Sequence, residues 1–549
     1  MQKIFYGGDI LTMVKEDDAP EAVWVKDGKI AYVGTREEAE RLADAGAKRI
    51  DLQGKTLMPS FIDAHSHMAM FSQFSSFADL SGCGDFGDIV SALEQYIKKN
   101  RIGENGAVVA CGYDHNFLKE EAHPTAKVLD RVSDTIPICL FHTSGHMAVA
   151  NTPLLREAGI SRKTKDPKGG RIGRDGSGEP DGYLEELPAV MPVLGKAFSR
   201  LDMDPVRQME EVQNIYLKYG VTTVQDGGAS GETVKEYLRL ARQNLLHVDV
   251  VAYVLADGRE IQALLREYPE AAGHYWHRFQ IGGGKIVLDG SPQGKTAWLT
   301  RPYEGGEECG YPAHTDGEVE QAARDAIAGN YQLLAHCNGD AASDQYLRCY
   351  GKALEALGKP GKDLRPVMIH CQTVRDDQLD RMTELGMIPS LFVAHTYYWG
   401  DVHLKNLGPG RGGRISPVKS ALERGLYYNF HQDSPVLKPD MMQTVWCAVN
   451  RVTRKGVKIG EEQCISVFDA LKGVTVHAAY AYHEEDRKGT VEEGKLADFV
   501  ILEANPLKTD KMALKDIGVE ETIKEGVSLY RKKAAGAVRP FLTISVKEV

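Results

Sequence analysis

Two histidines, His65 and His67, follow an apolar stretch in the segment Phe61-Ile62-Asp63-Ala64-His65-Ser66-His67. Side chains two residues apart on a β-strand point to the same face, so this spacing would turn both imidazoles in one direction. Neutral imidazole is a common ligand of zinc and other transition metals. The pair therefore predicts part of a metal site, although an isolated His-x-His pair is too common to establish one.

Three further side chains that bind metals come at the ends of later apolar stretches: His336, His370 and Asp433. An isolated histidine is usually a core or hydrogen-bonding residue, but the same placement on several stretches argues against coincidence. A carboxylate at such a position can bind a metal and take a proton from water. The alternatives are a turn or helix N-cap role for Asp433, or His431 in its place.

Lys285 begins the apolar stretch Lys285–Leu288, and its side chain is expected to point inward. A buried ammonium is costly unless it is paired or modified. A lysine that burial deprotonates can take up carbon dioxide and become a carbamate, whose two oxygens can bridge two metal ions. The alternative is a lysine paired with Asp289 or another acid. The glycines before Lys285 do not have the GxxxxGK[ST] spacing of a phosphate loop.

These residues need a scaffold that brings distant strand ends together. Strand-like stretches alternate with helical patterns through the middle of the chain, which predicts parallel βα units in an α/β fold. A (β/α)8 TIM-like barrel fits, and such barrels build their active sites at the carboxyl ends of the strands. The predicted strands are Leu57–Ile62, Val108–Cys111, Ile136–Phe141, Val221–Gln225, His247–Val254, Lys285–Leu288, Gln332–Ala335, Pro366–Ile369, Ile388–Val393 and Leu426–Phe430.

Both ends of the chain have the pattern of short strands. Val23–Val25 and Ile30–Val33 flank Asp27-Gly28, a dipeptide that favours tight hairpin turns. Near the other end, a glycine-rich turn leads into the apolar stretch 497–502. We therefore expect a β-sandwich domain built from both chain ends, at residues 1–58 plus 480–549, beside a barrel domain at 59–479.

More strands are predicted than a barrel can hold, and the surplus indicates a large insertion after the first barrel strand, at about 70–200. Within it, residues 166–182 are rich in glycine, proline and charge, so the sequence predicts a surface loop there. Such a loop is either a passive connector or a lid over the substrate.

Composition limits the class of protein. Hydrophobic residues make up 42% and charged residues 26% of 549, which is typical of a globular protein. A net charge of -11 argues against nucleic acid as a general partner. We find no secretory signal and no apolar stretch long enough to cross a membrane, and nine scattered cysteines indicate reduced thiols, so we expect a cytoplasmic protein with no membrane partner.

The chain resembles the amidohydrolase superfamily, and within it the amidohydrolase-3 branch of YtcJ-like and N-substituted formamide deformylase-like metal-dependent hydrolases. The resemblance covers nearly the whole chain. It rests on the segment from Met58-Pro59 to His67, on the K-x-x-x-D-G-S pattern from Lys285 to Ser291, on His336 and His370, and on Asp433 before Ser434-Pro435. Ser60 departs from the pattern, since glycine is common at that position.

The resemblance implies a barrel that bears the site, a sandwich of both chain ends, and one or two zinc ions or other divalent metals as cofactor. His65, His67 and Asp433 would hold one ion and His336 and His370 a second, with carboxylated Lys285 between them. It also points to substrate contacts at Ser144, His146 and Asp289, for which a structural role is the alternative. Tyr113, Asp114 and His115, and the group His395 to Trp399, are further segments that could approach the barrel mouth.

The predicted function is hydrolysis of a non-peptide C–N bond, in an amide, formamide or N-acyl amine, by metal-activated hydroxide, with Asp433 as the catalytic acid and base. The alternatives are hydrolysis of a cyclic amide, deamination of a heterocycle, or a catalytically silent metal-containing binding protein. The expected partner is a small-molecule substrate, and a homodimer is the default assembly.

Overall fold

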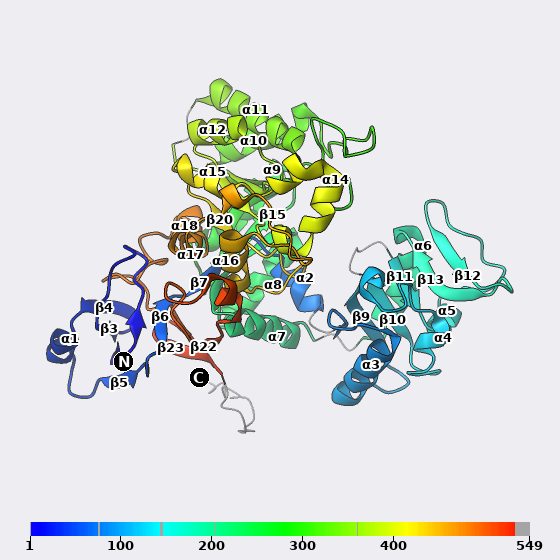
Figure 1. Cartoon of the computed structure of the whole chain (residues 1–549), viewed down its shortest axis with the longest axis horizontal. Helices are drawn as coiled ribbons and strands as arrows, with labels where there is room; N and C mark the ends of the chain where they lie inside the picture. Colours follow the sequence, from blue (N-terminus) through cyan, green and yellow to red (C-terminus); the bar gives the residue numbers. More distant parts are fainter. Residues whose placement is uncertain (1, 75–76, 143–146, 202–203, 359–360, 533–549) are drawn as a thin grey trace. The chain divides into compact units, whose positions relative to one another are not determined.

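The computed structural model of the chain describes residues 2–74, 77–142, 147–201, 204–358 and 361–532. The chain forms two compact units, one of Met1–Ala69 with Gln213–Val549 and the other of Met70–Val212 (Figure 1). Each unit has a hydrophobic core built on its own sheets.

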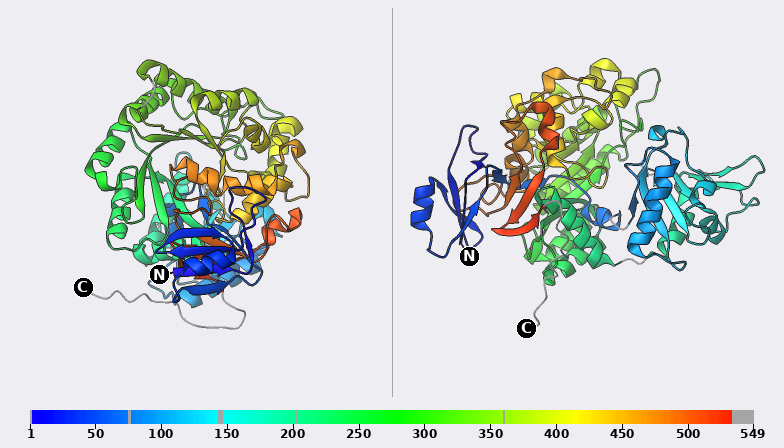
Figure 2. Two further views of the ribbon diagram at one scale, coloured as in Figure 1. Left: turned by 90° about the vertical axis from the view of Figure 1, so that its left-hand side faces the viewer. Right: turned by 60° about the horizontal axis from the view of Figure 1, so that its bottom comes forward.

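Eight parallel strands form the central sheet of the first unit. Helices lie on the outer side of these strands, as the green and yellow segments of Figure 2 show. The predicted (β/α)8 fold class is therefore confirmed. In spatial order the strands are β7 (Phe61–Asp63), β14 (Val221–Ala229), β15 (Asp249–Val254), β16 (Phe279–Val287), β17 (Gln332–Cys337), β18 (Val367–His370), β19 (Ile388–Leu391) and β20 (Asn429–Phe430).

The helices of the barrel follow the strands along the chain. Those between the second and eighth strands include α8 (Gly231–Arg242), α9 (Gly258–Glu267), α10 (Asp316–Gly329), α11 (Asp340–Leu357), α12 (Asp376–Leu385), α14 (Gly400–Gly413) and α15 (Val418–Glu423). Side chains that accept hydrogen bonds from the first turn begin several of them, for example Ser230 before α8 and Thr315 before α10. After β20 come α16 (Met441–Asn450), α17 (Val467–Gly473) and α18 (Val476–Ala481).

One predicted strand is divided in the structure. Residues Leu57–Ile62 were expected to form a single strand, but β6 (Thr56–Pro59) pairs with a strand near the carboxyl end of the chain, whereas β7 begins the barrel. The change of sheet occurs at Ser60, whose N–H donates to the Asp498 carbonyl at 3.0 Å and whose hydroxyl lies 2.6 Å from that of Thr222. An apolar run alone cannot show that its two halves belong to different sheets.

The glycine run before Lys285 lies inside a strand. The prediction began this strand at Lys285, but β16 begins at Phe279 and includes Gly282 to Gly284. A Cβ on Gly283 would lie 2.0 Å from the carbonyl oxygen of Gln332 on β17. The glycine is therefore required by the close approach of the neighbouring strand and makes no phosphate loop.

Two sheets at the ends of the chain face each other across one apolar core, in which Phe5 contacts Phe499 edge to face at 5.7 Å between ring centroids. Residues from both ends pair in the second sheet, where β6 is antiparallel to β21. The first sheet is β4 (Lys29–Gly34), β3 (Ala22–Lys26), β1 (Gln2–Tyr6) and β5 (Lys48–Asp51), and the second is β2 (Asp9–Ile10), β6, β21 (Phe499–Leu502), β22 (Val519–Lys524) and β23 (Val527–Arg531). The domain boundaries given above stay a prediction.

The Asp27-Gly28 hairpin is confirmed. Strands β3 and β4 are antiparallel, and Asp27 and Gly28 between them have φ angles of 51° and 79°. Two consecutive positive φ values are the signature of the tight turn that this dipeptide favours.

A buried group of charges joins the barrel to the second sheet of the sandwich. Asp249, the first residue of β15, lies 2.7 Å from Lys524 of β22 and 2.6 Å from Lys488, and all three side chains are buried. Arg278 contacts the same carboxylate at 3.3 Å. These cations hold the pKa of Asp249 below its ordinary value although burial opposes its charge.

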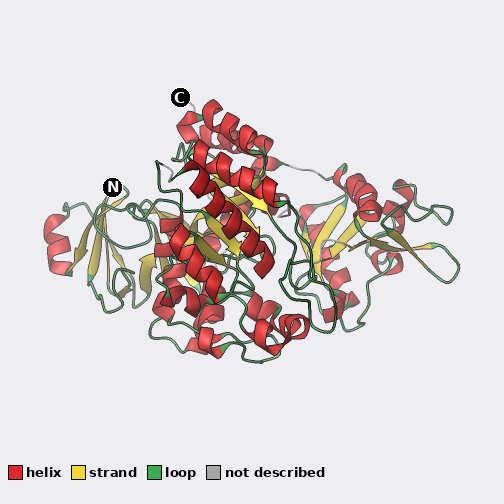
Figure 3. Cartoon of the chain, turned by 90° about the horizontal axis from the view of Figure 1, so that it is seen from above, coloured by secondary structure: helices red, strands yellow, loops and turns green. Residues whose placement is uncertain are grey.

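The second unit has a six-stranded sheet with apolar clusters on both faces, and Figure 3 shows helices on either side of its strands. Val108 and Ala110 of β9 face α3 (Phe86–Asn100), whereas Val109 faces α6 (Leu187–Phe198). Three strands are parallel, namely β8 (Ala78–Asp79), β9 (Val108–Tyr113) and β10 (Ile138–His142). Three are antiparallel, namely β11 (Met147–Ala150), β12 (Arg171–Arg174) and β13 (Pro180–Glu185).

The prediction of a loop at residues 166–182 is wrong. The segment contains β12 and the start of β13, which pair antiparallel around the turn at residues 175–178. Ile172 and Leu184 enter the core of the unit from this hairpin, which gives it an apolar face that the glycine-rich composition concealed.

Two expectations about the class of protein can be compared with the structure. All nine cysteines lie in the described part of the chain and are free thiols, as expected. Among the described residues, no helix combines the length and the apolar character needed to cross a membrane.

We expect Asp249→Asn to destabilise the first unit by about 3 kcal/mol, because two buried lysines lose an anion that they share. Urea unfolding followed by circular dichroism measures the change. The control is Glu232→Gln, which removes an exposed ion pair with Lys235 and should change the unfolding free energy little. Equal small effects for both variants would show that the buried charges do not stabilise the fold.

Candidate metal centre

The residues singled out by the sequence converge at the carboxyl ends of the barrel strands. His65 and His67 directly follow β7, and Asp433 follows β20. Lys285 lies near the end of β16, His336 near the end of β17, and His370 is the last residue of β18. Parallel strands bring these positions to one edge of the sheet, as the fold class predicts.

Backbone hydrogen bonds hold the first and last strand ends together. The Asp433 N–H donates to the His65 carbonyl at 3.2 Å, and the His67 N–H donates to the Ser434 carbonyl at 2.8 Å. Asp433 and His370 have φ angles of 55° and 75°, a region that non-glycine residues rarely adopt. Strained backbone of this kind clusters at functional sites, where the surrounding structure holds it in place.

The Asp433 carboxylate lies between the two histidines of the His-x-His pair. Its Oδ1 is 3.4 Å from His65 Nε2 and 3.2 Å from His67 Nε2, and Lys285 Nζ is 3.3 Å from the same His65 nitrogen. A tetrahedral zinc ion with ligands at 2.0–2.1 Å would hold neighbouring ligand atoms about 3.3–3.4 Å apart. The observed separations therefore have the spacing of atoms around one small cation.

The hydrogen bonds of His65 support the same conclusion. Its Nδ1 lies 2.5 Å from Gln225 Oε1, while the amide nitrogen of Gln225 donates to the Ala64 carbonyl and the Tyr482 hydroxyl. Nδ1 therefore carries the proton, and the Nε2 lone pair faces Asp433. Among the described residues, the buried Asp433 Oδ1 accepts no hydrogen bond. A lone pair and a carboxylate oxygen in contact repel each other unless a cation lies between them, so the residues fit a metal ion.

A second histidine chain lies beside this group. Ser390 Oγ is 3.0 Å from His431 Nδ1, and His431 Nε2 is 3.1 Å from His370 Nδ1. His370 can then direct its Nε2 towards the site, since its Nδ1 is engaged. His431 was the competitor of Asp433 in the sequence analysis, and the structure places it behind His370. One ligand atom each from His65, His370 and Asp433 lies within 4.8 Å of the others.

His336 lies next to this group without belonging to it. Its ring is 4.5 Å from that of His370, and its Nδ1 is 3.3 Å from Asp289 Oδ1. Asp289 also accepts from the N–H groups of Asn338, Gly339 and Trp298 at 2.7–3.0 Å. Asp289 thus ties together the loops around His336, whose buried Nδ1 has no hydrogen bond among the described residues. Its predicted contact with substrate stays a prediction, and the alternative pairing of Lys285 with Asp289 is not seen.

Burial sets the protonation of the site. Burial and the Lys285 charge lower the pKa of His65 well below its ordinary value, and burial with His336 does the same to His370. Burial lowers the pKa of Lys285 to about 7. Burial opposes the charge of Asp433, but His67 and the other imidazoles outweigh it and hold the pKa of that carboxyl well below its ordinary range. At neutral pH the site offers neutral imidazoles, a carboxylate and a lysine that loses its proton easily.

Sequence reasoning missed Gln225, which orients His65, and Ser390, which bonds His431 behind His370. Gln225 stands at the end of a predicted strand, which was the available signal, but amides at strand ends are too common to single it out. Ser144 and His146, which the resemblance proposed as substrate contacts, lie outside the described residues.

Comparisons with known proteins cover nearly the whole chain. The sequence profile of the Amidohydrolase family matches residues 48–530. The protein YtcJ of Bacillus subtilis (strain 168) is 27% identical over 97% of this chain and 100% of its own length. The N-substituted formamide deformylase of Arthrobacter pascens is 26% identical over 95% of this chain and 97% of its own. An uncharacterized metal-dependent hydrolase from Pyrococcus horikoshii OT3 has a similar structure, with a TM-score of 0.73 and 24% identity over 93% of this chain and 99% of that one.

We expect Gln225→Leu to weaken zinc binding at the barrel site about 10- to 100-fold, because His65 loses the acceptor that fixes its tautomer and ring orientation. Competition with a chromogenic chelator measures the affinity. Gln213→Leu is the matched control, since this buried glutamine bonds to Leu245 and His247 at the amino end of β15. An affinity that Gln225→Leu leaves unchanged would remove its assigned role.

Proposed function

The chain belongs to the amidohydrolase family, and from this premise we propose that it is a metal-dependent hydrolase that cleaves the C–N bond of a formamide or N-acyl amine. The observation that carries the proposal is the position of Asp433 Oδ1, buried without a hydrogen bond among the described residues and within 3.4 Å of the Nε2 atoms of His65 and His67. That oxygen suits both a metal ligand and a proton acceptor.

In this proposal the side chains at the strand ends hold one or two zinc ions or similar metals. His65, His67 and Asp433 would bind one ion, and His370 with His336 would bind the other. A divalent metal in such a site lowers the pKa of water from 15.7 to about 7. Lys285, whose pKa is lowered to about 7, would react with carbon dioxide as the neutral amine and supply carbamate oxygens towards His65.

Asp433 performs the proton transfers. A low pKa keeps its carboxylate ionised. In this proposal the attacking water is bound next to that carboxylate, which lies between His65 and His67. Asp433 takes a proton from water as the oxygen attacks the carbonyl carbon, and gives it to the nitrogen as the C–N bond breaks. A formamide and water then become formate and an amine.

Two observations support the choice of substrate class. The relative from Arthrobacter pascens is named an N-substituted formamide deformylase and is matched over 97% of its length. Beside the site, the ring of Phe392 lies 5.1 Å from His431, and His395 and the half-buried Trp399 continue this aromatic group. An apolar or aromatic substituent on the nitrogen would pack against such a group.

We expect Asp433→Asn to lower kcat/KM for N-formyl and N-acyl amines by about 10²- to 10⁴-fold, because the amide cannot accept and return the proton. Steady-state assays of amine release measure the loss, and elemental analysis should show that the variant retains its metal. Asp401→Asn, on the partly exposed start of α14, is the control and should keep full activity. Full activity in Asp433→Asn would end the proposed role of this residue.

We also expect zinc reconstitution of the metal-free enzyme at pH 8 to recover several-fold more activity with bicarbonate than in buffer free of carbon dioxide. With a pKa of about 7, Lys285 is mostly neutral at pH 8 and reactive, whereas at pH 6 it is mostly the ammonium and the effect should shrink. Lys285→Met should be inactive with or without bicarbonate. Equal recovery of the wild type in both buffers at pH 8 would exclude a carbamate.

A further inference from the structure

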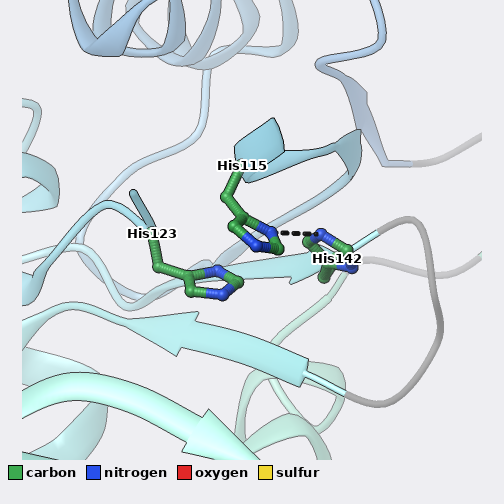
Figure 4. A group of neighbouring side chains, drawn as sticks. All are labelled: His115, His123 and His142. Carbon is green, nitrogen blue, oxygen red and sulfur yellow. Dashed lines mark hydrogen bonds between the residues drawn. The ribbon is translucent and has the colours of Figure 1, made fainter. Parts of the chain in front are cut away.

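A second group of histidines lies in the unit Met70–Val212, on a different sheet from the barrel. His115 follows β9, His142 ends β10, and His123 lies on the loop before α4 (Ala126–Leu129). Figure 4 shows the three imidazoles gathered at one place, with a hydrogen bond between His115 and His142. One nitrogen of each lies within 4.8 Å of the others.

The topology explains how residues far apart in sequence meet. Strands β9 and β10 are parallel neighbours, and His142 is in register with Tyr113 at their carboxyl ends. Asp114 and His115 directly follow β9 at that edge. The loop before α4 then brings His123 close to them. Carboxyl ends of parallel strands are the usual place for a site in an open α/β sheet.

The distances are those of a ligand set. His115 Nδ1 lies 3.2 Å from His142 Nε2, and Asp114 Oδ1 lies 3.8 Å and 3.6 Å from these two nitrogens. Neighbouring ligands of a tetrahedral zinc ion would be about 3.3–3.4 Å apart. Three imidazoles and one carboxylate are also the right number and type of donors for a closed tetrahedral site.

The surroundings orient the third imidazole. His123 Nδ1 lies 3.2 Å from the Tyr113 hydroxyl, and the His123 ring stacks on His115 at 4.0 Å and contacts Tyr183 at 4.6 Å. A bond to one ring nitrogen fixes the tautomer and directs the other nitrogen, as around metal-binding histidines generally.

A purely hydrogen-bonded cluster accounts for these contacts less well. One shared proton satisfies the contact between His115 and His142, but it leaves the His123 nitrogen that faces them without a role. One cation at the centre would be bound by one nitrogen of each of the three imidazoles.

We propose that His115, His123, His142 and Asp114 bind one divalent transition-metal ion, which fixes the segment after β9 against the end of β10. The site lies on the sheet of the second unit and does not depend on the function proposed for the barrel residues. With four protein ligands it is structural, and the chemistry of its donors favours zinc or cobalt over calcium or magnesium.

The test uses the full chain in the background His65→Ala/His67→Ala/His336→Ala/His370→Ala, so that neither ion proposed for the barrel keeps its histidine ligands. The protein is stripped of metal, equilibrated with zinc and analysed for bound metal, and cobalt is added to a second sample to record its visible spectrum. We expect about one equivalent of zinc and the intense absorption of tetrahedral cobalt. Adding His115→Gln/His123→Gln to the background should remove both.

The matched control adds His274→Gln/His277→Gln instead, which changes two exposed histidines of the other unit and should leave zinc and cobalt binding intact. His123→Gln alone, on a loop, is the variant least able to disturb folding, and should lower zinc affinity at least tenfold with an unchanged circular dichroism spectrum. Background protein that binds no zinc, or zinc that stays after His115→Gln/His123→Gln, would overturn the proposal. Either result would leave the barrel proposal standing.

Discussion

Residues of the candidate site make the backbone contacts that join the first and last strands of the barrel. Strands β7 and β20 are the edges of the parallel sheet, and backbone bonds join the chain just beyond them, from Asp433 to His65 and from His67 to Ser434. The same bonds set the Asp433 carboxylate between the two imidazoles. Because ligand positions follow from the closure of the sheet, the geometry of the site is as rigid as the fold itself.

This arrangement places groups that repel one another at the carboxyl ends of the barrel strands. The His65 lone pair faces a carboxylate, Lys285 lies beside the same nitrogen, and His370 and Asp433 hold backbone angles that cost about 1–3 kcal/mol each. Gln225 offsets part of this cost by bonding Nδ1 of His65, and Ser390 does so by bonding His431, which in turn contacts Nδ1 of His370. The inner atoms are left facing one another, and a cation is the simplest partner for all of them.

Much of the barrel site could be predicted from the sequence, because its residues lie at the ends of strands. His65, His67, Lys285, His336, His370 and Asp433 each stood at the end or start of an apolar stretch, and a barrel brings such positions together whatever their separation in sequence. The division of Leu57–Ile62 between two sheets could not be predicted, because it depends on pairing with a strand more than 400 residues later. Gln225 was equally hidden, since its importance lies in one contact across strands, and the hairpin at residues 171–185 has too few apolar residues to show a period.

The histidine group of the second unit could not be predicted from the sequence. The sequence analysis named Tyr113, Asp114 and His115 as a segment that could approach the barrel mouth, but nothing in the sequence connects them with His123 or His142. The parallel pairing of β9 and β10 brings His115 and His142 together. As in the barrel, the carboxyl ends of neighbouring parallel strands hold the side chains of the site. In both places two imidazoles and a carboxylate oxygen lie 3.2–3.8 Å apart. That spacing suits ligands around one ion, which is why we propose a metal at both places.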